Sequence, residues 1–433
     1  MKKPALHWQI LIAIGLAVVA GYSVNVAGGG DPTAPGVFGI PFVTMFDYVG
    51  DLFLNALRMI IVPLIMSSII VGMAGIGSGG NIGALGGRTI FFYVTTSIAA
   101  ILLGLLLINL VGPGYVDGEP AGDLLALDAS TANVAERVAG TGAGDVADLF
   151  KRMIPENVVM AASQAEMLGI IFFSLLFGYF MTRIGHELSE ALYKFWDGVF
   201  NVMMRMTEWI MLFAPIGVFG LVAGVVAETG FAAAGPLVKF AVTVLVALLA
   251  HTFITLPLFI RIVGRVSPWK MFPSMAPAML TAFSTASSSA TLPITMDCVE
   301  KNVGVSNKIS SFVLPLGATV NMNGTALYEC AAAIFLAQAY GLDLTFGTQF
   351  SIVTIALLTS IGVSGVPSAS LVAIAIILTA VGLPVEAIGV LMVFDRILDM
   401  VRTSVNIFGD SCCAVIVARL DGEETNLATK SAA

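Results

Sequence analysis

The chain has 433 residues, of which 58% are hydrophobic and 11% are charged, and its formal net charge is −8. Soluble proteins carry about a quarter charged residues, so this composition excludes an ordinary soluble protein and indicates one that crosses a lipid bilayer many times. The negative balance gives no basic surface for nucleic acid. The four cysteines have neither the spacing of a zinc site nor the pattern of a disulfide framework.

Apolar segments long enough to cross a membrane recur along the chain. The first follows Met1, Lys2 and Lys3 and is similar to a secretory signal, but many apolar segments come after it, so we expect it to be retained. The connection from Gly112 to Arg152 is polar and holds no membrane-length run. We predict transmembrane helices at about 8–27, 44–74, 86–112, 159–184, 194–228, 236–263, 308–340 and 384–418.

Charged residues in the connections indicate how the chain is oriented. Acidic residues occupy the connection from Asp117 to Asp148, and basic residues occupy the connections expected on the opposite side. Because loops rich in lysine and arginine stay in the cytoplasm, we expect both termini there, in a multi-pass protein of the inner (plasma) membrane. The basic residues are Lys2, Lys3, Arg183, Arg261, Arg265, Lys270, Lys301, Lys308 and Arg419.

Two further apolar stretches, at about 269–298 and 347–380, are interrupted by small and polar residues and predict re-entrant hairpins that do not cross the membrane. A helix with polar residues follows each of them, so the second half of the chain contains a weak repeat. If the first hairpin enters from the cytoplasm, the second enters from outside, and the two copies are inverted. Interrupted segments at matching positions in two halves are typical of the central site of a transporter.

The tips of these hairpins suit an anion. Where a half-helix begins, free backbone N–H groups and a partial positive charge face the cavity. The first tip adds the hydroxyl donors of Ser287, Ser288 and Ser289, and the second contains Gly362-Val-Ser-Gly-Val-Pro. A serine-rich turn can equally be a plain loop, but two such tips at equivalent positions favour a binding site.

The helix between the hairpins contains the polar cluster Asn321-Met-Asn-Gly-Thr325. Two amides and a glycine in four residues can unwind a membrane helix. The freed carbonyls, with amide and carboxylate oxygens nearby, are the hard ligands that Na⁺ selects. The alternative is a flexible kink that binds no ion. Glu329 follows in the reformed helix, either as a proton carrier or as a packed, protonated glutamic acid.

The last predicted helix carries a polar face. Six residues spaced 4, 3, 1, 3 and 4 apart fall on one side of it. Charged groups at membrane depth cost roughly 2.5–3.5 kcal/mol each on insertion scales, and they usually mark a substrate or ion pathway. The alternative is that these residues form ion pairs that only attach the helix to its neighbours. The six residues are Asp395, Asp399, Arg402, Thr403, Asn406 and Asp410.

At these residues the chain resembles the glutamate transporter family, the dicarboxylate/amino acid:cation symporters, over nearly its whole length. The resemblance implies an all-α membrane protein with eight transmembrane helices, two re-entrant hairpins and inverted repeats, assembled as a homotrimer. It also implies a transport domain that moves like an elevator against a fixed scaffold. The matching motifs are Ser-Ser-Ser-Ala-Thr-Leu-Pro (287–293), Asn-Met-Asn-Gly-Thr (321–325), Gly-Val-Pro (365–367) and Asp-Met-Val-Arg-Thr-Ser-Val-Asn-Ile-Phe-Gly-Asp (399–410).

The resemblance also divides the chain into parts. Residues 1–85 would hold the first two scaffold helices, and 86–112 a third helix that belongs to the transport domain. Residues 113–235 would form the extracellular connection and scaffold helices four and five. The remainder, 236–433, would be the rest of the transport domain, with both hairpins.

The resemblance further implies a role for individual residues. Arg402 would hold the side-chain carboxylate of an acidic amino acid, because its planar fork of donors fits a carboxylate better than a lysine does. Asp399 would hold the amino group and Asn406 the main-chain carboxylate. The implied substrate-binding residues are Ser287, Ser288, Met322, Thr325, Val366, Ser370, Asp399, Arg402, Thr403 and Asn406.

Three sodium sites are implied in the same way. The first would lie near Gly317, Asn321, Asn406 and Asp410. The second would use backbone carbonyls around Thr319, Met322, Ser360 and Val363. The third would lie near Tyr93, Thr96, Ser97, Asn321 and Asn323.

The chain departs from the family's pattern at two points. Asn323 stands where an aspartate is usual, so we expect fewer sodium ions than the fullest members use. The family's extra arginine is absent from both of its usual places, which are Ala286 and Met400 here, and Arg396 is a candidate to replace it. Glu329, by contrast, matches members that also carry a proton.

The sequence therefore predicts a secondary active symporter for aspartate or glutamate, driven by Na⁺ and H⁺, and not an enzyme. A C4-dicarboxylate or neutral amino acid symporter of the same fold is the alternative. Gly362-Val-Ser364-Gly365 also has the form of an intramembrane serine protease nucleophile, for which His251 is the histidine within a predicted span. A channel is a further alternative. The chain contains no Gly-x-x-x-x-Gly-Lys-Ser/Thr stretch for ATP-driven transport.

Overall fold

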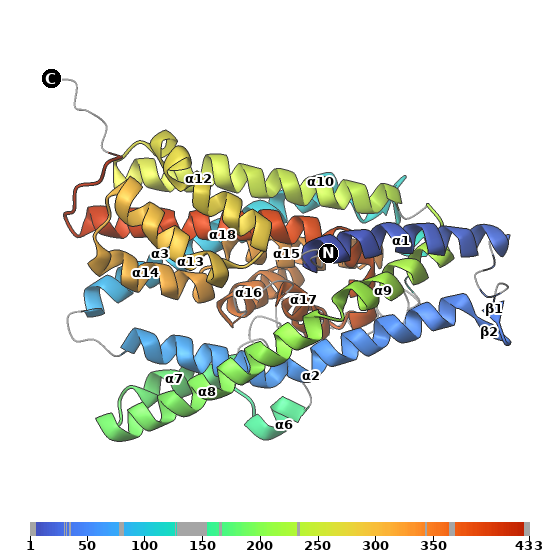
Figure 1. The fold of residues 1–433 in the computed structure, drawn as a ribbon, viewed down its shortest axis with the longest axis horizontal. Coiled ribbons are helices and arrows are strands. Elements are labelled where there is room, and N and C mark those ends of the chain that lie inside the picture. Colours follow the sequence, from blue (N-terminus) through green and yellow to red (C-terminus); the bar gives the residue numbers. More distant parts are fainter. Residues whose placement is uncertain are drawn as a thin grey trace, which may run out of the picture.

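The computed structural model is a bundle of long helices (Figure 1). Two short antiparallel hairpins accompany the helices. In one, β1 (Gly36–Val37) pairs with β2 (Ile40–Pro41), and in the other, β3 (Tyr115–Val116) pairs with β4 (Glu119–Pro120). The structure describes residues 6–29, 31, 33, 36–77, 82–125, 127, 154–163, 167–231, 234–342, 344–362 and 369–427.

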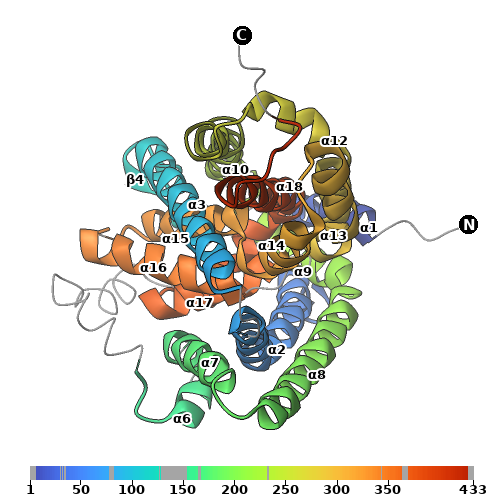
Figure 2. The ribbon, with the colours of Figure 1, turned by 90° about the vertical axis from the view of Figure 1, so that its left-hand side faces the viewer.

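One group of helices packs mainly on itself. Within it α2 contacts α7, α8 and α9, and α1 lies along α9. Figure 2 shows α2, α7 and α8 on one side of the bundle, below the helices of the second half of the chain. The members are α1 (Leu6–Ala27), α2 (Phe42–Gly77), α6 (Val158–Ser163), α7 (Met167–Met181), α8 (His186–Met211) and α9 (Ala214–Thr229).

The second group surrounds two buried helices. Every residue of α15 (Asn323–Ala339) is buried, and α18 (Ile388–Leu420) is buried along most of its length, because α3, α10, α12, α14 and α16 cover them. The other members are α3 (Ile82–Val111), α10 (Ala234–Ala250), η2 (His251–Thr255), α11 (Leu256–Phe259), η3 (Ile260–Gly264), α12 (Pro268–Thr285), α13 (Ser288–Asp297), η4 (Cys298–Val303), α14 (Asn307–Val320), α16 (Phe346–Gly362) and α17 (Ala369–Val381). Two short turns of 3₁₀ helix, η1 (Asp123–Leu125) and η5 (Val385–Ala387), complete the list.

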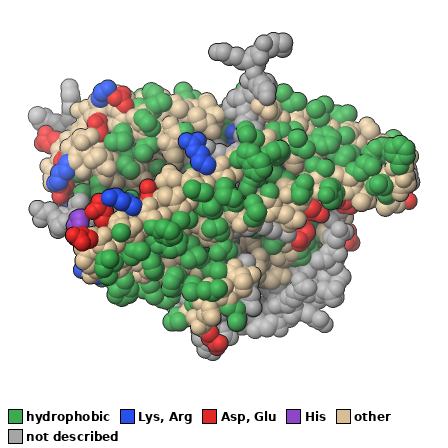
Figure 3. Space-filling model, turned by 60° about the horizontal axis from the view of Figure 1, so that its bottom comes forward, with side chains coloured by type: hydrophobic (Ala, Val, Ile, Leu, Met, Phe, Trp, Pro, Cys, Tyr) green, Lys and Arg blue, Asp and Glu red, His purple; other side chains and the backbone are tan. Residues whose placement is uncertain are grey.

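The surface suits a bilayer. Figure 3 shows hydrophobic side chains spread over the face that it presents, with most of the lysine and arginine near one end. Among the described residues, four helical stretches are long and apolar enough to cross a membrane, and shorter apolar helices accompany them. The four stretches are Trp8–Ala27, Leu85–Val111, Ala234–Gly264 and Val385–Leu420.

Each predicted span has a helix, or a broken helix, at its place. The span predicted at 194–228 is wrong in one respect, because it consists of two helices and its first helix begins earlier, at His186. The opening turns of α8, His-Glu-Leu-Ser-Glu, are polar on one side, so a search for continuous apolar sequence does not include them. The helix is interrupted after Met211, and Pro215 lies in the first turn of α9.

The first re-entrant hairpin is confirmed. Arms α12 and α13 meet at Ala286, which adopts a left-handed conformation with φ of +50°, and at Ser287, whose Oγ accepts a hydrogen bond of 3.2 Å from the N–H of Ala290. The second hairpin has arms α16 and α17, and its tip at 363–368 lies outside the described residues. The predicted unwinding of the helix between the two hairpins is also confirmed, since Asn321 and Met322 separate α14 from α15 with non-helical backbone angles.

Candidate functional site

Four charged side chains of α18 lie together in the interior of the bundle. Asp395, Arg396, Asp399 and Arg402 expose 3%, 4%, 6% and 0% of their surface. Buried charges persist where they are paired or where a ligand completes their surroundings. This cluster is therefore the first candidate for a substrate site.

Arg402 joins the two aspartates. Its Nη2 donates to Oδ1 of Asp395 at 3.0 Å and to Oδ1 of Asp399 at 3.1 Å. The guanidinium also stacks on the ring of Tyr328 in α15, with Cζ 3.8 Å from the ring centroid. Because a cation over an aromatic face is attracted to it, the stack holds the plane of the guanidinium.

Arg402 retains donors for a ligand. Its Nε and Nη1 have no hydrogen-bond partner among the described residues, although the side chain is fully buried. Leaving the donors of a buried charge unsatisfied costs free energy, so an anion with several acceptors is favoured beside them. A carboxylate has two such oxygens and the opposite charge.

Asn406 holds the start of α15. Its Oδ1 accepts hydrogen bonds from the N–H groups of Gly324 at 2.8 Å and Thr325 at 3.3 Å, and its Nδ2 donates to Oγ1 of Thr325 at 3.0 Å. These N–H groups lie in the first turn of α15, where a helix has no partners of its own. In this structure the amide therefore fixes the break in the helix, and its contact with a main-chain carboxylate stays a prediction.

Five of the predicted cation ligands gather between α3, α14 and α18. Nδ2 of Asn321 donates to Oδ1 of Asp410 at 2.8 Å, and Oγ of Ser97 donates to Oδ1 of Asn321 at 3.5 Å. A Cβ on Gly317 would lie 2.6 Å from Oδ1 of Asp410 and 2.7 Å from Oη of Tyr93, so only glycine permits this approach. Carboxylate, amide and hydroxyl oxygens thus converge as hard ligands for a small cation.

Thr96 and Asn323 make their contacts elsewhere. The hydroxyl of Thr96 donates to the carbonyl of Phe92 at 2.8 Å, within its own helix. Nδ2 of Asn323 lies 3.5 Å from Nε2 of His251, and its Oδ1 has no partner among the described residues. The third predicted sodium set is therefore assembled only in part.

The carbonyls of the second predicted sodium set remain candidates. The hydroxyls of Thr319 and Ser360 donate to carbonyls of their own helices, at 3.0 Å and 2.9 Å, so any cation there would bind to backbone oxygens, as the prediction requires. Helices α14 and α16 are in contact. The carbonyl of Met322 accepts from the N–H of Ala326 at 2.8 Å. Val363 lies outside the described residues.

Three of the remaining predicted substrate residues lie at the starts of half-helices, and Thr403 lies within α18. Ser287 and Ser288 begin α13, and Ser288 is 3% exposed. Ser370 lies at the start of α17, buried, and its Oγ has no partner among the described residues. Thr403 donates to the carbonyl of Asp399 at 2.8 Å. Val366, and Ser364 of the protease alternative, lie outside the described residues.

Glu329 connects α15 to the second hairpin. Its Oε2 accepts a hydrogen bond of 3.1 Å from Oγ1 of Thr359 in α16. Its Oε1 has no partner among the described residues, and the side chain is fully buried. A proton on the unpartnered oxygen would remove the negative charge of this fully buried carboxylate.

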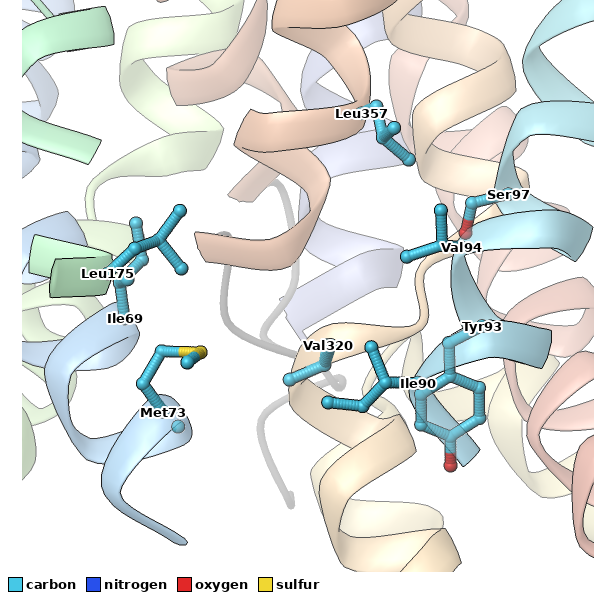
Figure 4. A pocket seen from close by; sticks show the side chains of 10 residues that line it. Ile69, Met73, Ile90, Tyr93, Val94, Ser97, Leu175, Val320 and Leu357 are labelled. Carbon is cyan, nitrogen blue, oxygen red and sulfur yellow. The ribbon is translucent and has the colours of Figure 1, made fainter. Parts of the chain in front are cut away.

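An apolar cavity of about 180 Å³ separates the two groups of helices. Figure 4 shows Ile69, Met73 and Leu175 on one side of it and residues of α3, α14 and α16 on the other. Tyr93 and Ser97 of the cation cluster lie on the second side. The groups are therefore in incomplete contact beside the candidate site. The cavity is lined by Ile69, Gly72, Met73, Ile90, Tyr93, Val94, Ser97, Leu175, Val320 and Leu357.

Three residues of the site were not assigned a ligand role from the sequence. Asp395 lies on the polar face of the last helix, and its spacing of seven residues from Arg402 indicates that the two can meet across two turns. Tyr328 has no such signal, because its partner lies on another helix. The sequence indicates His251 only as the base of the protease alternative, and in the structure it lies against Asn323.

Comparison with known proteins gives one consistent result. A model of the sodium:dicarboxylate symporter family matches residues 6–420. A proton/sodium-glutamate symport protein of Bacillus caldotenax is 34% identical over 427 residues, covering 98% of this chain and 96% of the relative. A proton/glutamate-aspartate symporter of Escherichia coli is 32% identical, covering 96% and 93%. Excitatory amino acid transporter 1 of Ambystoma tigrinum is 35% identical, covering 88% and 78%.

Proposed function

Because the chain belongs to the sodium:dicarboxylate symporter family, we propose that it is a secondary active symporter that moves acidic amino acids together with Na⁺ and H⁺. Two of the relatives named above are symporters of glutamate or of glutamate and aspartate, which supports this substrate class. A family of transporters also excludes the intramembrane protease and an enzymatic activity in general.

The proposal rests on two nitrogens of Arg402 that have no partner among the described residues. These donors, Nε and Nη1, suit the side-chain carboxylate of aspartate or glutamate. Oδ1 of Asp399 lies 3.1 Å from Nη2 of Arg402, and this carboxylate offers a negative charge to the amino group of a substrate. A dicarboxylate without nitrogen would leave that aspartate without a substrate partner, so the pair of charges favours an amino acid over succinate or malate.

The rest of the substrate site would close around this centre. Asn406 and Thr325 would face the main-chain carboxylate, and the two hairpin tips would cover the ligand from opposite sides. The half-helix that begins at Ser288 supports an anion there, because the N–H groups of its first turn lack helical partners. Ser287, Ser288, Met322, Thr325, Val366, Ser370 and Thr403 complete the proposed set.

Sodium is part of the cargo. We place one ion beside Asp410 and Asn321, where the oxygens converge, and a second among the backbone carbonyls at the ends of α14 and α16. Asn323 contributes no negative charge to a third site and makes its contact with His251, so a third ion would bind weakly. The transporter would accordingly use fewer sodium ions than relatives with an aspartate at this position.

Glu329 is the proposed proton carrier. It lies fully buried beside Thr359 of the second hairpin, with one oxygen that no described residue satisfies. A proton would neutralise it while the hairpin is closed over cargo, and hydration on the cytoplasmic side would favour its release.

We propose that one group of helices is the fixed scaffold and that the other is the moving transport domain. Residues 1–85 and 113–235 would form the scaffold, and 86–112 and 236–433 the transport domain, which slides as an elevator. The separate packing of the two groups and the cavity between them support this division.

We further propose a homotrimer in the plasma membrane with both termini in the cytoplasm. Helix α8 supports the assembly, since Leu188, Phe195, Val202 and Trp209 recur every seven residues and expose 65%, 59%, 56% and 61% of their surface. A seven-residue apolar repeat is typical of a seam between helices. Native mass spectrometry of the detergent-solubilised protein tests the stoichiometry, and a monomer or dimer as the main species would contradict it.

The substrate assignment is tested by competition. Purified protein in sodium buffer should bind L-aspartate, and L-glutamate should displace it far better than succinate or L-alanine. Succinate that competes as well as L-glutamate would contradict the assignment to amino acids. Binding of L-alanine as tight as that of L-aspartate would contradict a role for Arg402 in selecting an acidic side chain.

A further inference from the structure

Arg396 is a second arginine in the substrate site. Its side chain is 4% exposed, and its Nη1 lies 3.4 Å from Oδ2 of Asp399. Its Nε has no partner among the described residues. A guanidinium is rarely buried without a role, because its removal from water is costly unless charges and hydrogen bonds compensate it. The contact with Asp399 is the compensation that the described residues provide.

The four charges between positions 395 and 402 of α18 form a chain in which both aspartates contact an arginine. Arg396 contacts Oδ2 of Asp399, Arg402 contacts Oδ1 of the same carboxylate, and Arg402 also contacts Asp395. Two positive and two negative groups balance one another. Both oxygens of Asp399 are therefore engaged by arginine before any substrate arrives.

The amino group of a substrate must compete for Asp399. Arg402 is held by two ion pairs at 3.0 and 3.1 Å and by its stack on Tyr328. For Arg396, the described residues provide one ion pair, which is longer, at 3.4 Å. The weaker of the two contacts yields first, and it is the one at Oδ2. An incoming ammonium carries the same charge as the guanidinium that it would replace, so the balance of charges at Asp399 is maintained.

We propose that Arg396 is a positioning residue that contacts Oδ2 of Asp399 in the empty carrier and is displaced by the ammonium group of the substrate. In this way it sets the preference between substrates with and without an amino group. This inference rests on the proposed function. With Arg396 in place, the empty site is neutral and Asp399 is oriented. The cost is weaker binding of the ammonium. Without Arg396, Asp399 would attract an ammonium more strongly and would repel a dicarboxylate that lacks one.

The test is Arg396→Met, which keeps the length of the side chain and removes its charge. Binding of L-aspartate and of succinate to the purified protein in sodium buffer is measured by calorimetry and by competition. The Kd of L-aspartate should tighten about tenfold, since a buried group that competes for the carboxylate of Asp399 through a charged hydrogen bond is lost. The affinity for succinate should fall, so that the ratio of the two Kd values rises at least tenfold. Arg396→Lys should return that ratio toward the parent value, because it restores a positive charge.

Arg419→Met is the matched control. It removes the same charge from the same helix, about 35 Å further along at 1.5 Å per residue, where Arg419 donates to the carbonyls of Gly264 and Glu423. Its ratio of Kd values should equal that of the parent. If Arg396→Met aggregates, Arg396→Gln replaces it, and a thermal transition like that of the parent verifies the fold.

The outcomes separate this proposal from the proposed function. If the parent protein binds neither L-aspartate nor L-glutamate, the function itself fails. If the parent binds L-aspartate but Arg396→Met weakens both ligands by the same factor, or leaves both unchanged, Arg396 has a structural role only and the proposal is overturned. Tighter binding of L-aspartate together with weaker binding of succinate supports the proposal, because a general loss of packing cannot strengthen the binding of one ligand while it weakens that of another.

Discussion

Replacing Arg402 by alanine tests the most buried contact of the site. The side chain is 0% exposed and contributes two ion pairs and a stack on Tyr328. Without it, the side-chain carboxylate of aspartate would enter a buried site that already holds two carboxylates. Truncating one partner of a buried, hydrogen-bonded charge pair costs about 2–5 kcal/mol. We therefore expect the Kd of L-aspartate to rise by roughly 100-fold or more.

The variant should also change which substrates bind. Its site keeps Asp399 for an amino group but has no counter-charge for a second carboxylate, so neutral amino acids such as serine or alanine should gain affinity relative to aspartate. Calorimetry with L-aspartate, L-serine and L-alanine in sodium buffer measures this change. Unchanged affinity for L-aspartate would place the substrate elsewhere in the molecule and would refute the reasoning.

A second substitution distinguishes a loss of folding stability from a loss of ligand binding. Arg402→Ala leaves Asp395 and Asp399 buried beside each other without their shared cation, so its thermal transition should fall. Adding Asp395→Asn removes one of the two charges and should recover part of that transition. It should not recover binding of L-aspartate. Recovery of both together would show that the first substitution acted only through stability.

Three further changes test other parts of the site. Asp399→Ala should abolish detectable binding of L-aspartate in calorimetry, and binding within threefold of the parent would contradict its role toward the amino group. Glu329→Gln should remove the response of uptake to a pH gradient and leave the response to sodium, whereas an unaltered pH response would exclude Glu329 as the proton carrier. Gly317→Ala would place a Cβ 2.6 Å from Oδ1 of Asp410 and 2.7 Å from Oη of Tyr93, so half-saturation by sodium should shift at least tenfold upward, and an unchanged sodium titration would contradict a cation site there.

Much of the helical framework is predictable from the sequence because membrane helices are long and apolar. The first hairpin and the break at Asn321 and Met322 are predictable because polar and small residues interrupt otherwise apolar runs there. The start of α8 is not, because its first turns are amphipathic. The two β-hairpins have strands of two residues each, too short to carry a repeating pattern.

The site was predictable as a face of one helix but not as a set of contacts. Spacing along α18 indicates that Asp395, Asp399 and Arg402 share a side. It does not indicate that Asn406 reaches the first turn of α15, since Gly324 precedes it by 82 residues in the sequence. The direction of Arg396 was likewise undetermined, because a long side chain has many rotamers and its contact with Asp399 depends on which one the surroundings allow.

The central claim is that sodium drives an acidic amino acid through the site on α18. The most direct measurement is uptake of labelled L-aspartate into proteoliposomes, with a sodium gradient and a pH gradient imposed separately. An inward sodium gradient should accumulate L-aspartate above its external concentration, and an inward proton gradient should increase that accumulation. Uptake that stops at equal concentrations, or that ignores the sodium gradient, would contradict the account.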